Sequence, residues 1–142
     1  MIFTVDGKPQ GKARPRFNSY SGTVYTPKNT LDYEQLIRYM FFVNGGKKFG
    51  ADSFIKIIVT AYMSIPKRAT KDFKSKCLKG IQKPVNKPDV DNILKVVMDA
   101  LNGIAYDDDK QVVEAICKKE YSSGKPFIQV ELMESVFKNE GE

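Results

Sequence analysis

Histidine is absent from the 142 residues, and only two cysteines occur. Without histidine there can be no Ser-His-Asp or Cys-His catalysis, no histidine base and no histidine-ligated zinc. Cys77 and Cys117 stand far apart and belong to no CxxC pair, so a closed structural zinc site lacks its ligands. We expect them to be reduced, structural thiols of a cytoplasmic protein. Catalysis is left with carboxylates, lysines, tyrosines and oxygen-ligated metal ions.

Long apolar runs are also missing. No stretch approaches the roughly 20 apolar residues that span a bilayer, and the first eight residues lack the basic start and apolar run of a signal peptide. We therefore expect no membrane association. Because no linker-like composition or repeat interrupts the chain, we expect one domain over residues 1–142, with a polar tail at 134–142 that frays.

Acidic residues are fewer than basic ones, and two long segments contain almost none. Lysine and arginine outnumber aspartate and glutamate by 23 to 17, which gives a net charge of +6. Residues 7–30 contain no acid, and residues 67–87 contain only Asp72. A basic surface favours nucleic acid or an anionic membrane as partner, although mild basicity alone is common in proteins that bind neither.

The acids that are present concentrate between residues 89 and 109. Crowded carboxylates repel one another unless a cation lies among them, so a divalent metal ion is the simplest explanation. On a helix, Asp91, Lys95 and Asp99 would share one face, and Asp108 and Asp109 could fold back onto it. Such an oxygen-rich pocket suits Mg²⁺ or Mn²⁺ and the hydrolysis of phosphodiesters.

Each of these features alone has an ordinary explanation. A D-x-D spacing is common on solvated surfaces, and three aspartates in a turn usually form an exposed loop. Asp99 is expected to be an ion-pair partner of Lys95 on the helix surface rather than a metal ligand. Tyr20 and Tyr25 could either pack or stack on bases. The combination of two acidic clusters joined by one helix, in a basic chain without histidine, favours the metal site.

Hydrophobic periodicity predicts strands at 1–5, 53–65, 111–121 and 126–133, the last two as a terminal hairpin. It predicts helices at 30–43 and 89–102, with Thr30 and Asp89 as their N-caps and Gly103 as the stop signal of the second. A short strand is expected around 23–25 and a short helix in the first half of 67–87. The predicted fold class is α+β, a mixed sheet packed with helices.

Two points of this prediction stay open. Helix 30–43 could cover the sheet or lie at a dimer interface. Phe41, Phe42 and Phe49 are apolar enough for an interface, but we expect most of them in the core.

The sequence from Lys87 to Val112 resembles the RusA family of Holliday-junction resolvases. The family pattern is a D-x-D-N-x-x-K helix, then D-A-L, then D-D-x-Q-V. Here these motifs read Asp89-x-Asp91-Asn92-x-x-Lys95, then residues 99–101, then residues 108–112. The segments 11–17 and 25–27 also resemble the N-terminal part of phage-type members.

The resemblance implies a RusA-like fold and a small homodimeric endonuclease that uses Mg²⁺, with Mn²⁺ as a possible substitute, and no small-molecule cofactor. Such enzymes resolve four-way DNA junctions by paired symmetric nicks, and a dimer suits two cuts related by a two-fold axis. The resemblance implies the catalytic residues Asp89, Asp91, Lys95 and Asp109. The three aspartates are the implied metal ligands, with Asp108 as a further or alternative ligand because three consecutive aspartates leave the alignment open by one residue.

For DNA binding, we expect phosphate contacts from lysines and arginines of the two basic segments. The residues predicted for this role are Lys12, Arg14, Arg16, Lys71, Lys74 and Lys87. Two alternatives remain: a less selective nuclease acting on flaps or other branches, and a branched-DNA-binding protein without catalysis. A calcium-loop protein is disfavoured because no EF-hand spacing is present. A phage or prophage recombination role would suit the resemblance.

Overall fold

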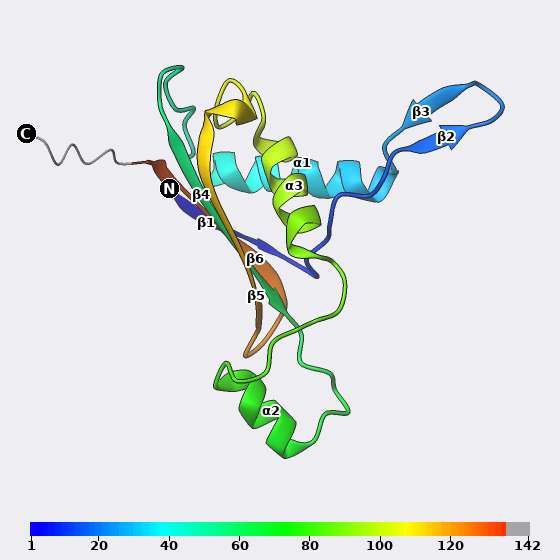
Figure 1. Ribbon diagram of the computed structural model, residues 1–142, viewed down its shortest axis with the longest axis vertical. Coiled ribbons are helices and arrows are strands. Elements are labelled where there is room, and N and C mark those ends of the chain that lie inside the picture. Colours follow the sequence, from blue (N-terminus) through cyan, green and yellow to red (C-terminus); the bar gives the residue numbers. More distant parts are fainter. Residues whose placement is uncertain (136–142) are drawn as a thin grey trace, which may run out of the picture.

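A four-stranded sheet with two helices on one face forms the body of the protein, and two small projections extend from it (Figure 1). The computed structural model describes residues 1–135. Its elements are β1 (Ile2–Asp6), β2 (Arg16–Asn18), β3 (Thr23–Tyr25), α1 (Lys28–Val43), β4 (Ile55–Met63), α2 (Lys71–Leu78), α3 (Val90–Leu101), the 3₁₀ turn η1 (Asp109–Gln111), β5 (Val112–Tyr121) and β6 (Phe127–Glu134). The predicted α+β class with a mixed sheet is confirmed.

The strand order in the sheet is β1-β6-β4-β5, with β5 parallel to β4 and the other pairs antiparallel. The predicted terminal hairpin is therefore wrong, because β4 lies between β5 and β6. Alternation of apolar residues identifies a strand but says nothing about its partner. Every residue of β4 is buried or only partly exposed, which suits its central place in the sheet.

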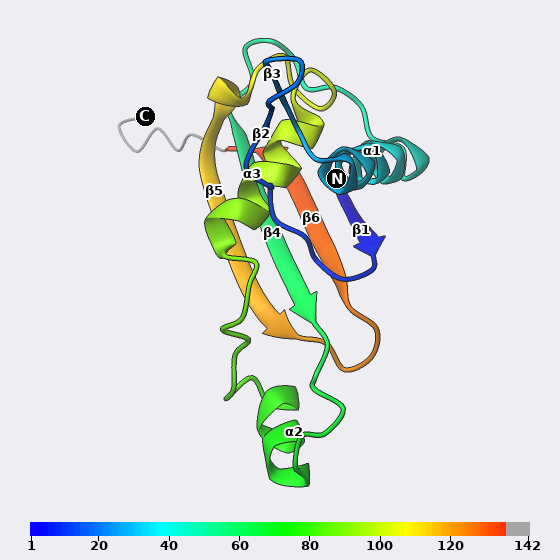
Figure 2. The same ribbon diagram turned by 90° about the vertical axis from the view of Figure 1, so that its right-hand side faces the viewer.

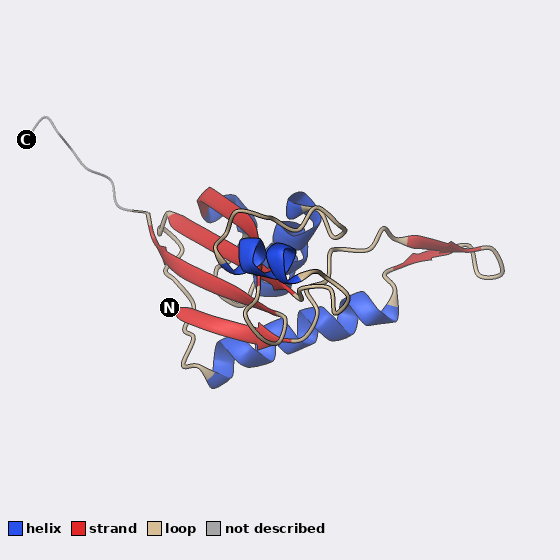
Figure 3. Cartoon of the chain, turned by 90° about the horizontal axis from the view of Figure 1, so that it is seen from below, coloured by secondary structure: helices blue, strands red, loops and turns tan. Residues whose placement is uncertain are grey.

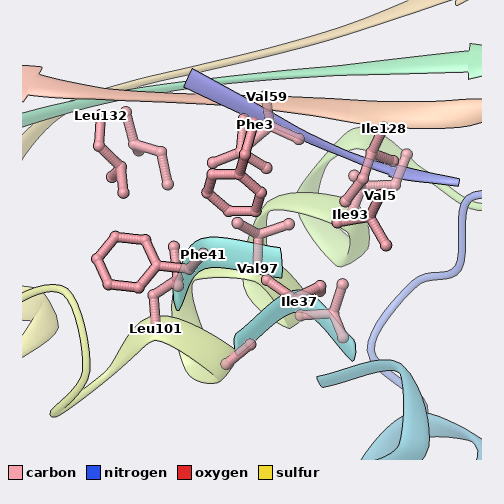
Figure 4. Close-up of a cluster of buried hydrophobic side chains, with 14 of the residues drawn as sticks. Phe3, Val5, Ile37, Phe41, Val59, Ile93, Val97, Leu101, Ile128 and Leu132 are labelled. Atoms are coloured by element: carbon pink, nitrogen blue, oxygen red, sulfur yellow. The ribbon is translucent and has the colours of Figure 1, made fainter. Parts of the chain in front are cut away.

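The core lies between this sheet and the helices α1 and α3 (Figures 2 and 4). On α3, Ile93, Val97 and Leu101 recur on one side and are fully buried. On α1, Phe41 is fully buried and meets Phe3 of β1 edge-to-face, with ring centroids 6.0 Å apart. The inner side of helix α1 thus covers the sheet.

The three phenylalanines divide between core and surface. Phe41 belongs to the core and Phe49 packs against it, as expected, whereas Phe42 is exposed. No helix within residues 1–135 is both long and apolar enough to cross a bilayer.

The helix boundaries correct one prediction and refine another. α1 begins at Lys28, with Pro27 at its N-cap, so Thr30 is not the cap but a buried residue of the first turn. Pro27 ends the preceding extended segment with a φ of −54°, which leads directly into the helix. Asp89 does occupy the N-cap position of α3, yet its side chain makes no capping hydrogen bond. Gly103 follows the helix with a φ of +75°.

The first two residues of the predicted fraying tail, Glu134 and Ser135, are bound to the body of the protein. β6 includes Glu134, and the backbone N–H of Ser135 donates to the carbonyl oxygen of Phe54 at 2.7 Å. The remainder of the predicted tail, residues 136–142, lies outside the described residues.

Two projections leave the body in different directions (Figures 1 and 3). One is the ribbon of β2 and β3, which pair only with each other within the part of the chain described. The short strand at 23–25 was predicted, but its partner at 16–18 was not. The other is the segment around α2, the predicted short helix, which is capped by the Thr70 side chain accepting from the N–H of Phe73 at 3.2 Å.

Candidate active site

Helix α3 and the turn that follows it bring distant acidic residues to one surface. Asp91, Lys95 and Asp99 lie four residues apart on α3, on the side opposite the buried Ile93 and Val97. They line a shallow hollow of about 300 Å³ together with Leu94, Met98 and Asp109. The predicted meeting of the helix face with the acidic turn is therefore observed for Asp109.

The acidic turn is fixed to its surroundings by Gln111 and Asn102. The Gln111 side-chain amide donates to the carbonyl oxygens of residues 50, 51 and 53 at 3.0 to 3.2 Å, and its oxygen accepts from the N–H of Asp107 at 2.9 Å. Asn102, at the C-cap of α3, accepts from the N–H of Asp109 at 3.0 Å. These bonds hold the turn against both the helix and the loop before β4.

Tyr106 adds a buried anchor to the same turn. Its ring is fully buried, and its hydroxyl donates to the carbonyl oxygen of Met98 on α3 at 2.8 Å. Burial raises the pKa of the Tyr106 hydroxyl, and the nearby Asp109, Asp99 and Asp108 carboxylates raise it further. The Tyr106 hydroxyl therefore stays protonated at physiological pH and keeps its hydrogen bond to α3.

Asp108 and Asp109 have different environments although they are neighbours. The Asp108 carboxylate accepts from the backbone N–H of Lys110 at 2.9 Å, which lowers its pKa. The pKa of Asp109 is raised by desolvation and by the Asp108 and Asp99 carboxylates near it. Asp108 is thus engaged in capping η1, whereas Asp109 lines the hollow and forms no salt bridge within residues 1–135.

Asp89 lines a second, more polar hollow next to the first turn of α3. This hollow of about 390 Å³ is formed with Gly11, Lys12, Arg14, Lys87, Pro88 and Asn92. Asp89 is exposed, and its side chain accepts no hydrogen bond from the N–H groups of the first turn of α3. Within residues 1–135, no three acidic or cysteine side chains stand close enough together to form a ready-made metal site.

Lys12 is placed differently from the prediction. Its ammonium lies 2.9 Å from the Glu34 carboxylate on α1 and 3.2 Å from the Asp99 carboxylate on α3. Burial lowers the pKa of Lys12, but the bonds to Glu34 and Asp99 outweigh burial and raise it overall. Lys12 is therefore an internal ion-pair partner rather than an exposed phosphate contact.

This arrangement also corrects the expected ion pair on α3. Asp99 pairs with Lys12, not with Lys95, and Lys95 forms no salt bridge within the described part of the chain. The partner of Asp99 comes from 87 positions earlier, which helical spacing could not reveal. Glu34 was missed altogether, although an acid on the apolar face of a predicted helix signals a buried partner.

The remaining predicted basic residues divide among three places. Lys87 lies in the polar hollow beside Asp89, and Arg14 reaches the same hollow from the start of the β2–β3 ribbon. Arg16 is exposed on β2. Lys71 and Lys74 are exposed on α2, at the end of the molecule opposite the acidic turn (Figures 1 and 2).

Comparison with known proteins places these features in one family. The family model of endodeoxyribonuclease RusA matches residues 6–133. A protein described as "Uncharacterized protein YqaN", from Bacillus subtilis (strain 168), is 34% identical over 136 residues, covering 93% of this chain and 94% of that protein. The matched family model describes a class of DNA endonucleases. The chain is a member of the endodeoxyribonuclease RusA family, which confirms the resemblance found in the sequence.

Proposed function

We propose that this protein resolves four-way DNA junctions by paired, metal-dependent nicks during recombination. The observation that carries the proposal is the hollow along α3, where Asp91, Lys95 and Asp109 meet from two separate segments. Family membership supports nuclease activity, and the basic remainder of the surface suits a polyanionic substrate.

The side chains around the hollow offer the type of ligand atom that a hard divalent cation prefers. The groups around the hollow are carboxylates without histidine or cysteine, which matches the oxygen preference of Mg²⁺ and Mn²⁺. We propose Asp89, Asp91 and Asp109 as the ligands, since the Asp89 side chain makes no capping hydrogen bond. Asp109 is favoured over Asp108 because the Asp108 carboxylate is occupied by the N–H of Lys110. When bound, the ion would supply Lewis acidity at the scissile phosphate.

Two lysines have separate roles in this proposal. Lys95 lines the hollow and has no salt-bridge partner within residues 1–135, so its ammonium is available to stabilise negative charge on the reacting phosphate. Lys12 instead pairs with Asp99, and through Asp99 it holds the segment before β2 against the last turn of α3.

A homodimer is part of the proposal because two opposed strands must be cut. Two identical sites related by a two-fold axis satisfy this requirement. The outer side of α1 exposes Leu36, Tyr39, Phe42 and Val43, which is an unusual number of apolar side chains for a solvated helix. We propose this side of α1 as the dimer surface, and sedimentation of a Tyr39→Glu variant as a monomer would support it.

Cleavage of a synthetic four-way junction with Mg²⁺ tests the proposal. We expect symmetric paired nicks that disappear in EDTA and in Asp91→Asn but persist in Asp32→Asn, an exposed acid on α1. Equal cleavage of flaps and junctions would instead indicate a less selective branch nuclease.

A non-catalytic role in binding branched DNA is the second candidate. It is favoured by the lack, within residues 1–135, of three acids already grouped for a metal. Tight junction binding without nicks in either Mg²⁺ or Mn²⁺ would establish this role and exclude the catalytic one.

A further inference from the structure

The ribbon of β2 and β3, here called the arm (residues 13–26), has no core of its own. Every residue of both strands is exposed, and the strands pair only with each other within residues 1–135. Phe17 is 66% exposed and Tyr20, at the tip, is fully exposed. A two-stranded ribbon without a buried face is marginally stable alone. Its exposed aromatic side chains therefore indicate a surface that binds a partner.

The charge of the arm selects the chemistry of that partner. No acidic residue occurs from Gly7 to Leu31, while Arg14 and Arg16 stand at the entrance to β2. Exposed aromatic rings next to cations are the combination with which proteins hold unpaired nucleic-acid strands, because rings stack on bases and cations contact phosphates. The tyrosines therefore do not serve as core packing, which was one of the two readings of Tyr20 and Tyr25.

The root of the arm is fixed beside the candidate active site. The backbone N–H of Lys12 donates to the carbonyl oxygen of Asn92 on α3 at 2.9 Å, and its side chain binds Glu34 and Asp99. A β-carbon added to Gly11 would lie 2.9 Å from Cβ of Asn92, so glycine permits this close approach. The other end of the arm enters α1 through the buried Pro27.

The tip of the arm is also ordered. The Asn18 side-chain oxygen accepts from the N–H groups of Tyr20 and Ser21 at 2.9 and 3.3 Å, and its carbonyl accepts from Gly22 at 2.8 Å. Gly22 has a φ of +70°, which a residue with a side chain rarely adopts. The backbone that carries Tyr20 is thus ordered before any partner arrives, which lowers the backbone entropy lost on binding.

We propose that the arm recognises the branch point, with Phe17 and Tyr20 stacking on unpaired or unstacked bases and Arg14 and Arg16 holding the flanking phosphates. This inference rests on the proposed function in one respect, namely that the substrate is branched DNA. It assigns the preference for a junction over linear duplex to the arm, separately from the carboxylates that perform the cleavage.

The test measures binding without cleavage. A four-way junction carrying 2-aminopurine next to the branch point is titrated in EDTA with wild-type protein, with Phe17→Ala/Tyr20→Ala, and with Phe54→Ala. Phe54 is an exposed aromatic residue outside the arm and the proposed sites, and it serves as the matched control. We expect wild type and Phe54→Ala to raise the 2-aminopurine fluorescence several-fold, and the double variant to abolish the rise.

Affinity gives a second readout. The double variant should lose about tenfold or more in junction affinity, as expected for losing at least one base stack, with less than twofold change for linear duplex. Arg14→Gln/Arg16→Gln should instead weaken both DNA forms and flatten their salt dependence. Circular dichroism equal to wild type shows that the variants are folded.

Three outcomes would overturn the inference. The double variant could bind the junction and raise the fluorescence as wild type does, it could weaken junction and duplex equally, or it could convert a dimer to a monomer on sedimentation. The last result would make the arm a contact between copies of the chain. Failure of the proposed function is distinguishable, because wild-type protein would then leave the junction uncut in Mg²⁺ while the EDTA fluorescence result stands.

Discussion

The acidic and basic parts of this molecule are built in opposite ways. Asp108 and Asp109 lie in a turn that is tied by hydrogen bonds to α3 and to the loop before β4. Arg14, Arg16 and Lys71 instead project from a ribbon and a small helix that stand away from the core. Chemistry at one phosphate requires fixed groups, whereas contacts along a DNA backbone tolerate mobile ones. Lys12 differs from these cations, since its ammonium is paired with the Glu34 and Asp99 carboxylates.

The largest effect outside the proposed metal ligands should come from Lys95, the cation that lies among the acids. Lys95→Met should reduce junction nicking about a hundredfold or more because it removes charge stabilisation at the reacting phosphate. Junction affinity in EDTA should change little. Lys110→Met, an exposed lysine of the neighbouring turn, is the matched control. A parallel loss of affinity and nicking would move Lys95 to the group of DNA-contacting residues.

Lys12 separates a structural cation from the DNA-contacting cations. Lys12→Met leaves the nearly buried Glu34 without its partner, so the free energy of unfolding should fall by about 2 kcal/mol. The expected loss is smaller than for a fully buried ion pair because Asp99 is partly exposed. Urea denaturation measures this loss, and Lys12→Met/Glu34→Gln should recover much of it. Arg14→Gln should leave stability unchanged. A Lys12 variant as stable as wild type would contradict the assignment.

The smallest effect concerns the repulsion that remains around Asp109. Because desolvation and, after it, the neighbouring Asp108 and Asp99 carboxylates raise the pKa of Asp109, the ionised side chain slightly destabilises the metal-free protein. Asp109→Asn should therefore abolish nicking yet raise metal-free stability by a few tenths of a kcal/mol at neutral pH, a small value because the site is exposed.

The pH dependence of that gain has a definite sign. The gain is present above the raised pKa of Asp109 and disappears as the pH falls through it, where the wild-type carboxyl becomes protonated. Added salt should also diminish it. Thermal unfolding at several pH values measures both trends, and a destabilised Asp109→Asn protein would mean that Asp109 makes favourable contacts in the metal-free state.

Local pattern was sufficient for much of the fold. The apolar stripe of Ile93, Val97 and Leu101 predicted α3. The opposite side of the helix, which carries Asp91 and Lys95, was therefore expected to face outward. The alternation in residues 53–65 likewise predicted β4. These signals are strong because burial of one side imposes a period on the sequence.

Features that depend on distant partners were beyond the reach of local pattern. The place of β4 between β5 and β6 follows from how three strands share the core, and the sequence of each strand is compatible with several orders. The pairing of Lys12 with Glu34 and Asp99 joins three segments, so no single window contains it. The acidic site was predictable in composition, while the ties that fix its turn were not.

The insertion of β6 between β1 and β4 has a consequence for synthesis of the protein. Val130 faces Phe3 on one side and Val59 on the other, so β1 cannot join the sheet until β6 has emerged from the ribosome. A nascent chain that ends before residue 127 contains α3 and the acidic turn but lacks the strand that completes the sheet beneath them. Assembly of the site is thereby delayed until residues 127–134 have been synthesised.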